Sequence, residues 1–203
     1  MSPGRAPLPL LIACVVSGCA TVRMTDPGRT ATEQLLLSTA ADRAVQQLDL
    51  APLSGRKVFV DATNFEGADK AYALGSLSSR AADKGALLVP KVDEAAVIAA
   101  ARAGALSIDR AEFLIGIPRL VLPTPTGATV QTPEVALVKR VAQTGIAKLA
   151  LAAYETGSGR QVLSAGPVSG TSYYTLWTLM GFSWRVTDVP EKAPRFRWWP
   201  WGT

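Results

Sequence analysis

The chain has 203 residues, of which 21 are Lys or Arg and 16 are Asp or Glu, giving a net charge of +5; it has two Cys and no His. Without His it lacks the commonest zinc ligand and the usual general base near neutral pH, which excludes most metalloenzyme and hydrolase templates. The length suits one domain that buries its own core without disulfides or a structural metal.

The N-terminus has the pattern of a bacterial lipoprotein signal peptide. Arg5 precedes an apolar segment from Ala6 to Val16, and Val16-Ser17-Gly18-Cys19 then has the order of a lipobox. Such a signal needs a positive start, a short apolar core and small residues before the cleavage site. We expect removal of residues 1–18, with diacylglycerol and an N-linked acyl chain on Cys19. An ordinary secretory signal or an apolar first helix is the alternative.

Lipidation would use the last thiol, because Cys14 lies in the signal peptide. Several acyl chains make an anchor effectively permanent, since each buried methylene contributes about 0.8 kcal/mol. Ala20 stands where an inner-membrane retention signal has Asp, so we expect the periplasmic face of the outer membrane. Later apolar runs are shorter than the roughly 20 residues of a membrane helix. This location excludes nucleic acid as a partner, and no metal or other cofactor is expected.

The first elements after the lipid are a tether and a helix. Residues 19–29 contain Asp26-Pro27-Gly28 and show no periodicity, which indicates a tether. Thr30 and Glu33 form a capping box before an apolar stripe at helical spacing, and Pro52 ends this element.

A strand, a helix and a second strand follow. Lys57 to Asp61 is apolar on both faces, which favours a central strand. Ala68 to Lys84 keeps a helical period, Gly85 ends the helix, and Ala86 to Val89 predicts a short strand. Ala95 to Ala103 fits either state, although its Val-Ile pair favours a strand.

The second half is predicted to be mainly β. Leu120 to Pro133 carries three prolines and predicts a loop that offers a contact surface. Glu134 to Ala142 and Ile146 to Tyr154, separated by Thr144-Gly145, predict an antiparallel meander. Gly157-Ser158-Gly159 predicts the turn into another strand.

The predicted fold class is therefore α+β: a single domain over residues 30–190, with a mixed or antiparallel sheet and two main helices. The block from Tyr173 to Val186 fits strand or helix. Residues 191–203 form a separate tail that is rich in arginine and tryptophan: Arg195, Phe196, Arg197, Trp198, Trp199 and Trp201. Because Trp favours the headgroup region and Arg pairs with phosphates, the tail is a candidate for membrane or partner contact. Packing of its rings on the domain is the alternative.

Several segments together resemble small periplasmic lipoproteins related to the curli secretion channel and to the activators of penicillin-binding proteins. They are the lipobox, the strand Gly55 to Asp61, the helix end Lys84-Gly85-Ala86 and the turn Tyr154 to Gly157. The resemblance implies either a ring-forming subunit with membrane-spanning hairpins or a soluble domain that docks on a synthase.

A second set of residues resembles a different family, known only as a domain of unknown function, and this resemblance is closer than the one to the curli and activator lipoproteins. Gly104 to Asp109, followed by Leu114 to Pro118, resembles that uncharacterised lipoprotein family. The channel pattern fits less well, because Lys139-Arg140 and Lys148 interrupt the apolar rows of the two candidate hairpin strands.

Candidate chemistry is sparse. Ser54 and Lys57 have the serine-x-x-lysine spacing of penicillin-interactive enzymes, but the chain lacks the other motifs of that class, so a turn is the preferred interpretation. The polar residues that follow the first strand suit either a ligand or a turn before the next helix: Asp61, Asn64, Glu66 and Asp69. Asp109, Arg110 and Glu112 suit a local ion pair.

The sequence thus predicts a non-enzymatic lipoprotein, anchored to the outer membrane, that binds or scaffolds an envelope protein or a peptidoglycan-associated partner. A subunit of an oligomeric secretion or export assembly is the alternative. A third is an enzyme on cell-wall or lipid material, in which Asp61 or Asp109 acts without His. The sequence leaves the oligomeric state open.

Overall fold

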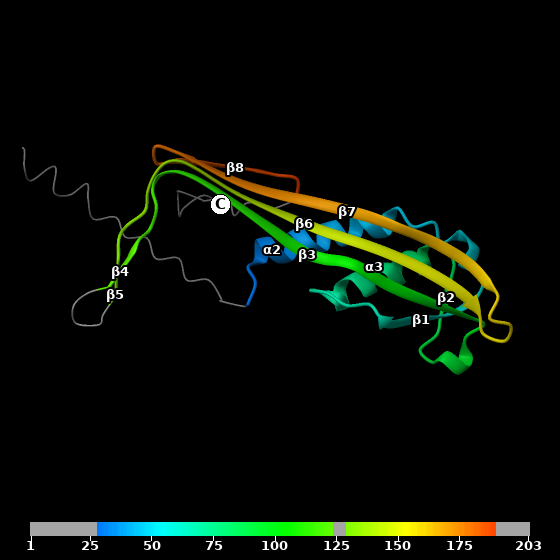
Figure 1. Cartoon of the computed structure of the whole chain (residues 1–203). Helices are drawn as coiled ribbons and strands as arrows, with labels where there is room; N and C mark the ends of the chain where they lie inside the picture. Colours follow the sequence, from blue (N-terminus) through cyan, green and yellow to red (C-terminus); the bar gives the residue numbers. More distant parts are fainter. Residues whose placement is uncertain (1–27, 124–128, 190–203) are drawn as a thin grey trace, which may run out of the picture. The chain divides into compact units, whose positions relative to one another are not determined.

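A computed structural model describes residues 28–123 and 129–189 of the chain (Figure 1). The chain divides into two units, residues 1–30 and residues 31–203, and every element described below belongs to the second unit. Its helices and strands are α2 (Ala31–Gln46), β1 (Lys57–Asn64), α3 (Lys70–Asp83), β2 (Leu87–Leu88), β3 (Val97–Ile117), β4 (Val121–Pro123), β5 (Thr129–Gln131), β6 (Val135–Glu155), β7 (Gln161–Leu179) and β8 (Phe182–Thr187).

Six of the strands form one mixed sheet in the order β2-β1-β3-β6-β7-β8. β1 is parallel to both of its neighbours, whereas β3, β6, β7 and β8 are antiparallel to one another. This confirms the predicted α+β domain with two main helices. The predicted central position of β1 is wrong: it is second from the edge, beside the two-residue strand β2.

Both predicted helices are present. α2 buries one face against the sheet, as the apolar stripe predicted, through Leu36, Leu37, Ala40, Ala41, Ala44 and Val45. α3 buries Ala73, Leu77 and Ala81 and packs against α2. Gly85 follows α3 with a φ of 89°, a left-handed conformation that suits Gly and ends the helix.

The sheet approaches α2 closely because two glycines lie beneath it. A Cβ at Gly170 of β7 would lie 2.0 Å from the carbonyl oxygen of Ala40, and a Cβ at Gly145 of β6 would lie 2.7 Å from that of Leu36. Side chains at these positions would push the helix away from the sheet. The two glycines therefore set the distance between the layers.

The predicted meander at residues 134–154 is wrong, because these residues form one continuous strand, β6. β6 pairs along its length with β3 and β7, and its register runs through Gly145 without a turn. The glycine that was interpreted as a turn is instead a site of helix packing.

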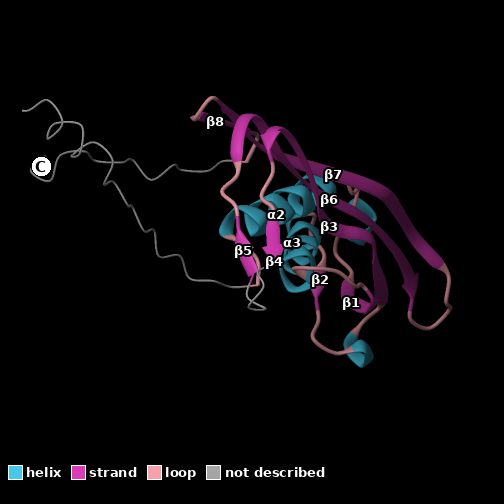
Figure 2. Cartoon of the chain, turned by 60° about the vertical axis from the view of Figure 1, so that its left-hand side comes forward, coloured by secondary structure: helices cyan, strands magenta, loops and turns pink. Residues whose placement is uncertain are grey.

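Two further segments are now assigned. The predicted loop Leu120–Pro133 contains the hairpin of β4 and β5, paired as Leu122 with Val130 (Figure 2). The undecided block from Tyr173 to Val186 is β-structure, with β7 and β8 joined at Met180-Gly181. Both turn residues have positive φ, as a tight two-residue hairpin requires.

The helices cover only part of the long strands. β3 and β6 each have 21 residues and β7 has 19, and they extend well beyond α2 (Figure 1). The last buried residues along these strands are Leu106 of β3, Gly145 of β6 and Ser172 of β7. We call the remaining four-stranded part the distal sheet: residues 109–117, 135–144, 173–179 and 182–187.

Candidate interaction surface

The two faces of the distal sheet are defined by a contact with α2. Ser172 Oγ donates a hydrogen bond of 2.6 Å to the carbonyl oxygen of Leu36, so Ser172 and its cross-strand partner Gly145 face the helix. Side chains alternate along a strand. Tyr174 and Gln143 therefore lie on the helix side, and Tyr173 and Thr144 lie on the opposite side.

The side opposite the helices is apolar across all four strands. Its residues, assigned from the register, are Ala111, Phe113, Ile115, Val138, Ala142, Thr175, Trp177, Leu179, Phe182, Trp184 and Val186, together with Arg140 and with a polar border nearest the helices formed by Asp109, Thr144 and Tyr173. We call this surface the apolar face. Phe113 and Trp184 are about half exposed and Phe182 is 79% exposed, so the described residues leave the surface uncovered.

One row of the apolar face carries a cation and three aromatic rings. The register places Phe113, Arg140, Trp177 and Trp184 side by side on β3, β6, β7 and β8. The indole rings of Trp177 and Trp184 are stacked, with centroids 6.3 Å apart, and Arg140 Cζ lies 5.4 Å from the Trp177 centroid. The electron-rich face of the Trp177 indole attracts the Arg140 guanidinium, and the stacked indoles attract each other. These contacts hold Arg140, Trp177 and Trp184 in one arrangement.

The helix side of the distal sheet carries the ion pairs. Lys139 Nζ lies 2.7 Å from both Glu112 Oε1 and Glu134 Oε1, and Arg110 is 3.7 Å from Glu112. Hydrogen bonding to Lys139 lowers the pKa of Glu112, and hydrogen bonding to Glu112 and Glu134 raises the pKa of Lys139. The two sides of the distal sheet therefore differ: the helix side mixes these ion pairs with exposed apolar residues such as Val135 and Leu137, and the opposite side is mainly apolar.

The turns at the end of the distal sheet also expose apolar side chains, next to one charged residue, the exposed Arg119. Met180, in the β7–β8 turn, is 73% exposed, and Ile117, Leu120 and Val121, at the end of β3 and the start of β4, are about half exposed. Residues in turns that face water are usually polar. This end of the sheet therefore extends the apolar surface.

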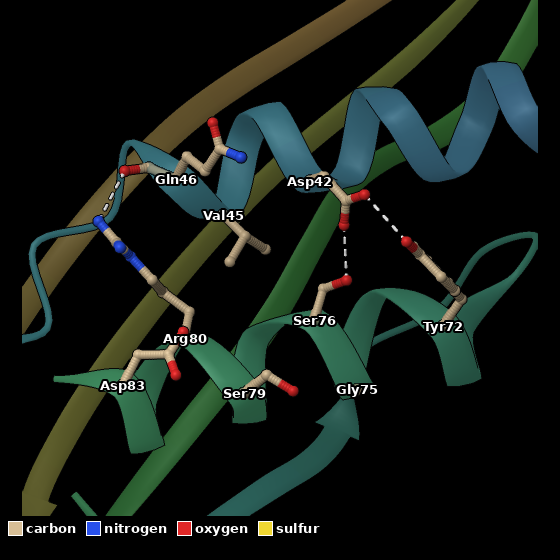
Figure 3. A pocket seen from close by; sticks show the side chains of 9 residues that line it. All are labelled: Asp42, Val45, Gln46, Tyr72, Gly75, Ser76, Ser79, Arg80 and Asp83. Carbon is tan, nitrogen blue, oxygen red and sulfur yellow. Dashed lines mark hydrogen bonds between the residues drawn. The ribbon is translucent and has the colours of Figure 1, made fainter. Parts of the chain in front are cut away.

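A groove of about 580 Å³ lies between α2 and α3 (Figure 3). Ser76 Oγ donates to Asp42 at 2.6 Å and Tyr72 OH donates to the other Asp42 oxygen at 2.9 Å. The bond to Asp42 raises the pKa of Tyr72. Arg80 donates to the carbonyl oxygen of Gln46. These bonds join the two helices, so helix pairing accounts for Asp42, Tyr72 and Ser76 and for one hydrogen bond of Arg80.

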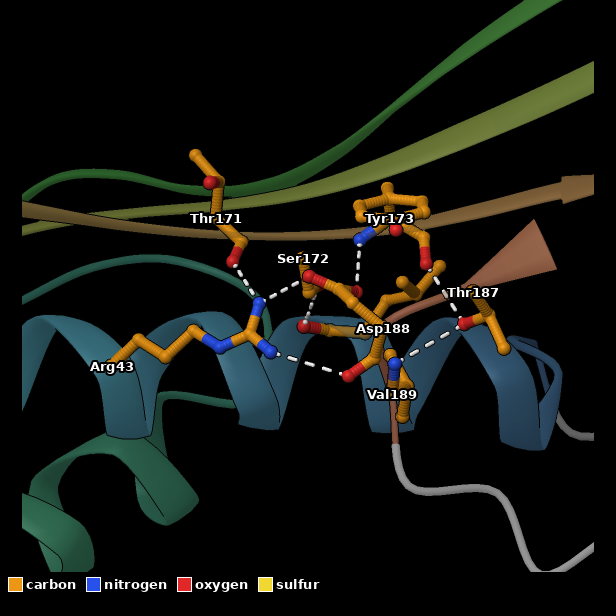
Figure 4. A network of polar contacts seen from close by, with 8 residues as sticks. Arg43, Thr171, Ser172, Tyr173, Thr187, Asp188 and Val189 are labelled. Atoms are coloured by element: carbon orange, nitrogen blue, oxygen red, sulfur yellow. Dashed lines mark hydrogen bonds and ion pairs between the residues drawn. The ribbon is translucent and has the colours of Figure 1, made fainter.

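A second polar network joins α2 to the end of β8 (Figure 4). Arg43 donates to the carbonyl oxygen of Thr171 at 2.6 Å and forms an ion pair with Asp188. Asp188 also accepts a hydrogen bond of 2.7 Å from the Tyr173 amide. The network holds the chain after β8 against the helix and has a structural role.

The polar residues after β1 are engaged locally. Asp61 accepts hydrogen bonds from the hydroxyl and amide of Thr63, which lower its pKa, and Glu66 pairs with Lys70 at 3.0 Å. Asp69 precedes α3 with a φ of 57°. These contacts favour the turn over a ligand site. In residues 28–123 and 129–189, no group of three or more His, Cys, Asp or Glu is placed to hold a metal ion.

The other candidate residues are separated by the fold. Alternation along β3 places Asp109 on the apolar side and Arg110 with Glu112 on the other, so the three do not form one site. Ser54 has extended backbone angles at the end of a short 3-10 helix, whereas Lys57 begins β1. The Ser-x-x-Lys spacing therefore does not correspond to a helical turn.

The predicted lipobox and tail residues lie outside the described part of the chain: Val16, Ser17, Gly18, Cys19, Arg195, Phe196, Arg197, Trp198, Trp199 and Trp201. Among the described residues, no helix is both long and apolar enough to cross a membrane.

Sequence reasoning missed the apolar face because it divided β6 into two strands. Lys139 and Arg140 were interpreted as a joint interruption, but in one strand they point to opposite sides, and only Arg140 lies on the apolar face. Lys148 lies farther along β6, outside the distal sheet. Strict alternation counted through Gly145 would have revealed the surface.

Comparison with known proteins gives a family but no activity. No curated protein and no solved structure matches the chain. A family model matches residues 13–185, which is most of the sequence. The expectation of an uncharacterised family is thereby confirmed, and the chain belongs to the family of unknown function DUF6655.

Proposed function

We propose that this protein is a non-enzymatic lipoprotein, anchored through Cys19 to the periplasmic face of the outer membrane, that binds or scaffolds an envelope component. The observation that carries the binding role is the apolar face. The anchor rests on the lipobox Val16-Ser17-Gly18-Cys19. The Arg/Trp-rich tail, residues 195–201, is a second candidate contact.

The extent of the apolar face supports a binding role. Monomeric soluble proteins rarely expose contiguous apolar patches beyond a few hundred Å², and larger ones mark interaction sites. Here apolar side chains continue across four strands and onto the turns at Met180 and Leu120. A binding or scaffolding role requires a surface of this kind, and the carboxylates considered for catalysis, Asp61 and Asp109, lie apart from it or at its margin.

Two measurements test this proposal. The intact mass of the protein extracted from membranes should show loss of residues 1–18 and gain of a diacylglycerol and an acyl chain, and Cys19→Ala should abolish both changes. An unprocessed wild-type chain would refute the anchor. Photocrosslinkers at Phe113 or Phe182 should then capture an envelope component in cells, whereas one at Leu87, an exposed residue of β2, should not.

A subunit of an oligomeric secretion or export assembly is the second candidate, and the open edges of the distal sheet favour it. β1 pairs with β3 only as far as Arg102, and β8 pairs with β7 on one side. Unpaired edge strands are templates for pairing with another chain. Pairing of β8 with β3 of the next copy is head-to-tail and repeats, closing into a ring if the rotation allows.

The native mass of the protein in mild detergent separates these two candidates. A monomer or dimer after subtraction of the micelle favours the binding lipoprotein. A discrete ring of many copies favours the assembly. Proline at Ser183 of β8, a non-hydrogen-bonded position whose N–H points away from β7, removes one donor of the open edge and should then lower the proportion of rings.

A further inference from the structure

We propose that the apolar face of the distal sheet contacts the acyl chains of a membrane. This inference rests on the proposed function, which holds the domain at a membrane, and it names lipid as the component that covers this face.

The two ends of the apolar face differ in polarity. The row nearest the helices contains Asp109, Thr144 and Tyr173. The next rows contain small and apolar side chains and then the row of Arg140 with its aromatic neighbours. The last row is entirely apolar, with Ile115, Val138, Leu179 and Phe182. The face is therefore polar where it meets the part covered by the helices and apolar at its far end, with one cation between, as a surface that lies against lipid requires.

The row that contains Arg140, Trp177 and Trp184 has the composition of a membrane interface. Tryptophan rings favour the boundary between headgroups and acyl chains, and an arginine there pairs with phosphate. Phe113 in this row is four residues, or about 13 Å at the rise of a β-strand, from Ile117 at the end of β3, so the row stands at the border between the polar part of the sheet and its apolar end.

Charge along the apolar face is arranged for an anionic surface. Among the described residues of this face, the acidic one is Asp109, at the end nearest the helices, and the basic one is Arg140, in the aromatic row. Beyond that row the strand positions of the face carry no charged side chain, and the next cation along the chain is the exposed Arg119, after the end of β3. An anionic headgroup would therefore meet the arginine, and the acyl chains would meet only apolar groups.

The opposite face explains how the sheet can do this without burying charge. Lys139, Glu112 and Glu134 bond one another on the helix side. If the sheet lies in the membrane surface with its apolar face inward, these ion pairs remain in water, as the polar face of an interfacial amphipathic element does. The exposed Met180 of the β7–β8 turn then lies against the lipid at the end of the sheet, and Arg119 can reach the headgroups.

Tryptophan fluorescence tests this contact. The chain has five tryptophans, so a variant with Trp198, Trp199 and Trp201 changed to Phe retains only Trp177 and Trp184. The lipidated variant is reconstituted into vesicles of phosphatidylethanolamine and phosphatidylglycerol, with or without brominated phosphatidylcholine. We expect blue-shifted emission and a marked loss of intensity with the brominated lipid. Equal intensity in both vesicles overturns the proposal.

A matched pair of substitutions controls the test. Phe182→Asp places an acid on the apolar face at a highly exposed position and should restore most of the lost fluorescence. Leu87→Asp makes the same kind of change on β2, at an exposed position outside the distal sheet, and should leave the quenching unchanged. Equal effects of the two substitutions would also overturn the proposal. Circular dichroism confirms that both variants are folded.

The outcomes separate this inference from the proposed function. Intact mass reports lipidation of Cys19 independently of the fluorescence. A lipidated protein with unquenched Trp177 and Trp184 overturns the inference alone, and a dimeric native mass would then assign the apolar face to a second copy. An unlipidated protein whose tryptophans are quenched on added vesicles overturns the anchor and retains the inference.

Discussion

Ser172 of β7 donates its hydroxyl hydrogen to the carbonyl oxygen of Leu36 in α2 at 2.6 Å, and both residues are buried. This bond identifies which side of β7 faces the helix. By alternation, it also identifies which side of the distal sheet is exposed and apolar. A single contact between helix and strand thus determines the orientation of the proposed interaction surface.

Loss of this bond should destabilise the domain. Ser172→Ala removes the donor and leaves the Leu36 carbonyl without its additional hydrogen bond, and we expect a decrease of about 1 kcal/mol in the free energy of unfolding. Urea denaturation followed by circular dichroism measures it. Thr175→Ala, on the exposed side of the same strand, is the control and should change the free energy much less. Equal losses would contradict the assigned faces.

Gly170 should tolerate no side chain. A Cβ there would lie 2.0 Å from the Ala40 carbonyl oxygen and 2.6 Å from the Ala44 amide nitrogen, both in the backbone of α2. Because neither can move alone, Gly170→Ala should cost about 3 kcal/mol or more and displace the helix. Gly157→Ala is the control, since nothing lies within 4 Å of a Cβ at that position. Thermal unfolding of the two variants compares them.

Glu155 should titrate far below a typical carboxyl. The side chains of Arg160 and Ser158 donate hydrogen bonds that lower its pKa from 4.5 to about 2. Because the folded pKa is the lower one, the stabilisation is present above pH 4.5 and is lost as the pH falls towards 2. NMR titration of the carboxyl carbon measures the pKa directly. Arg160→Gln should raise it, and an unchanged pKa in this variant would refute the assigned cause.

Arg43 and Asp188 should be energetically coupled. The ion pair is partly buried and shares its atoms with the Thr171 carbonyl and the Tyr173 amide, so its charges are held in one geometry. A double-mutant cycle with Arg43→Met and Asp188→Asn should give a coupling of about 1.5 kcal/mol. Additive losses would show that each residue acts through its other bonds. Hydrogen exchange of the Tyr173 amide should accelerate in both single variants.

Several elements were determined by the local sequence. α2 and α3 follow from apolar residues at helical spacing, and Gly85 ends α3 because a left-handed conformation at that position favours glycine. The turn at Gly157-Ser158-Gly159 was also predicted correctly, since β6 ends at Glu155 and β7 begins at Gln161. Such signals are read within a few residues, without knowledge of the fold.

What only the tertiary structure decided is the role of Gly145 and, with it, the interaction surface. By itself the sequence Thr144-Gly145 between two β-like runs indicates a turn, because glycine is common there. In the fold the same glycine allows α2 to approach, since a Cβ would lie 2.7 Å from the Leu36 carbonyl. Leu36 is distant in sequence, so no local pattern contains this constraint. The continuous strand that results places Lys139 and Arg140 on opposite sides of the sheet and leaves one of those sides apolar.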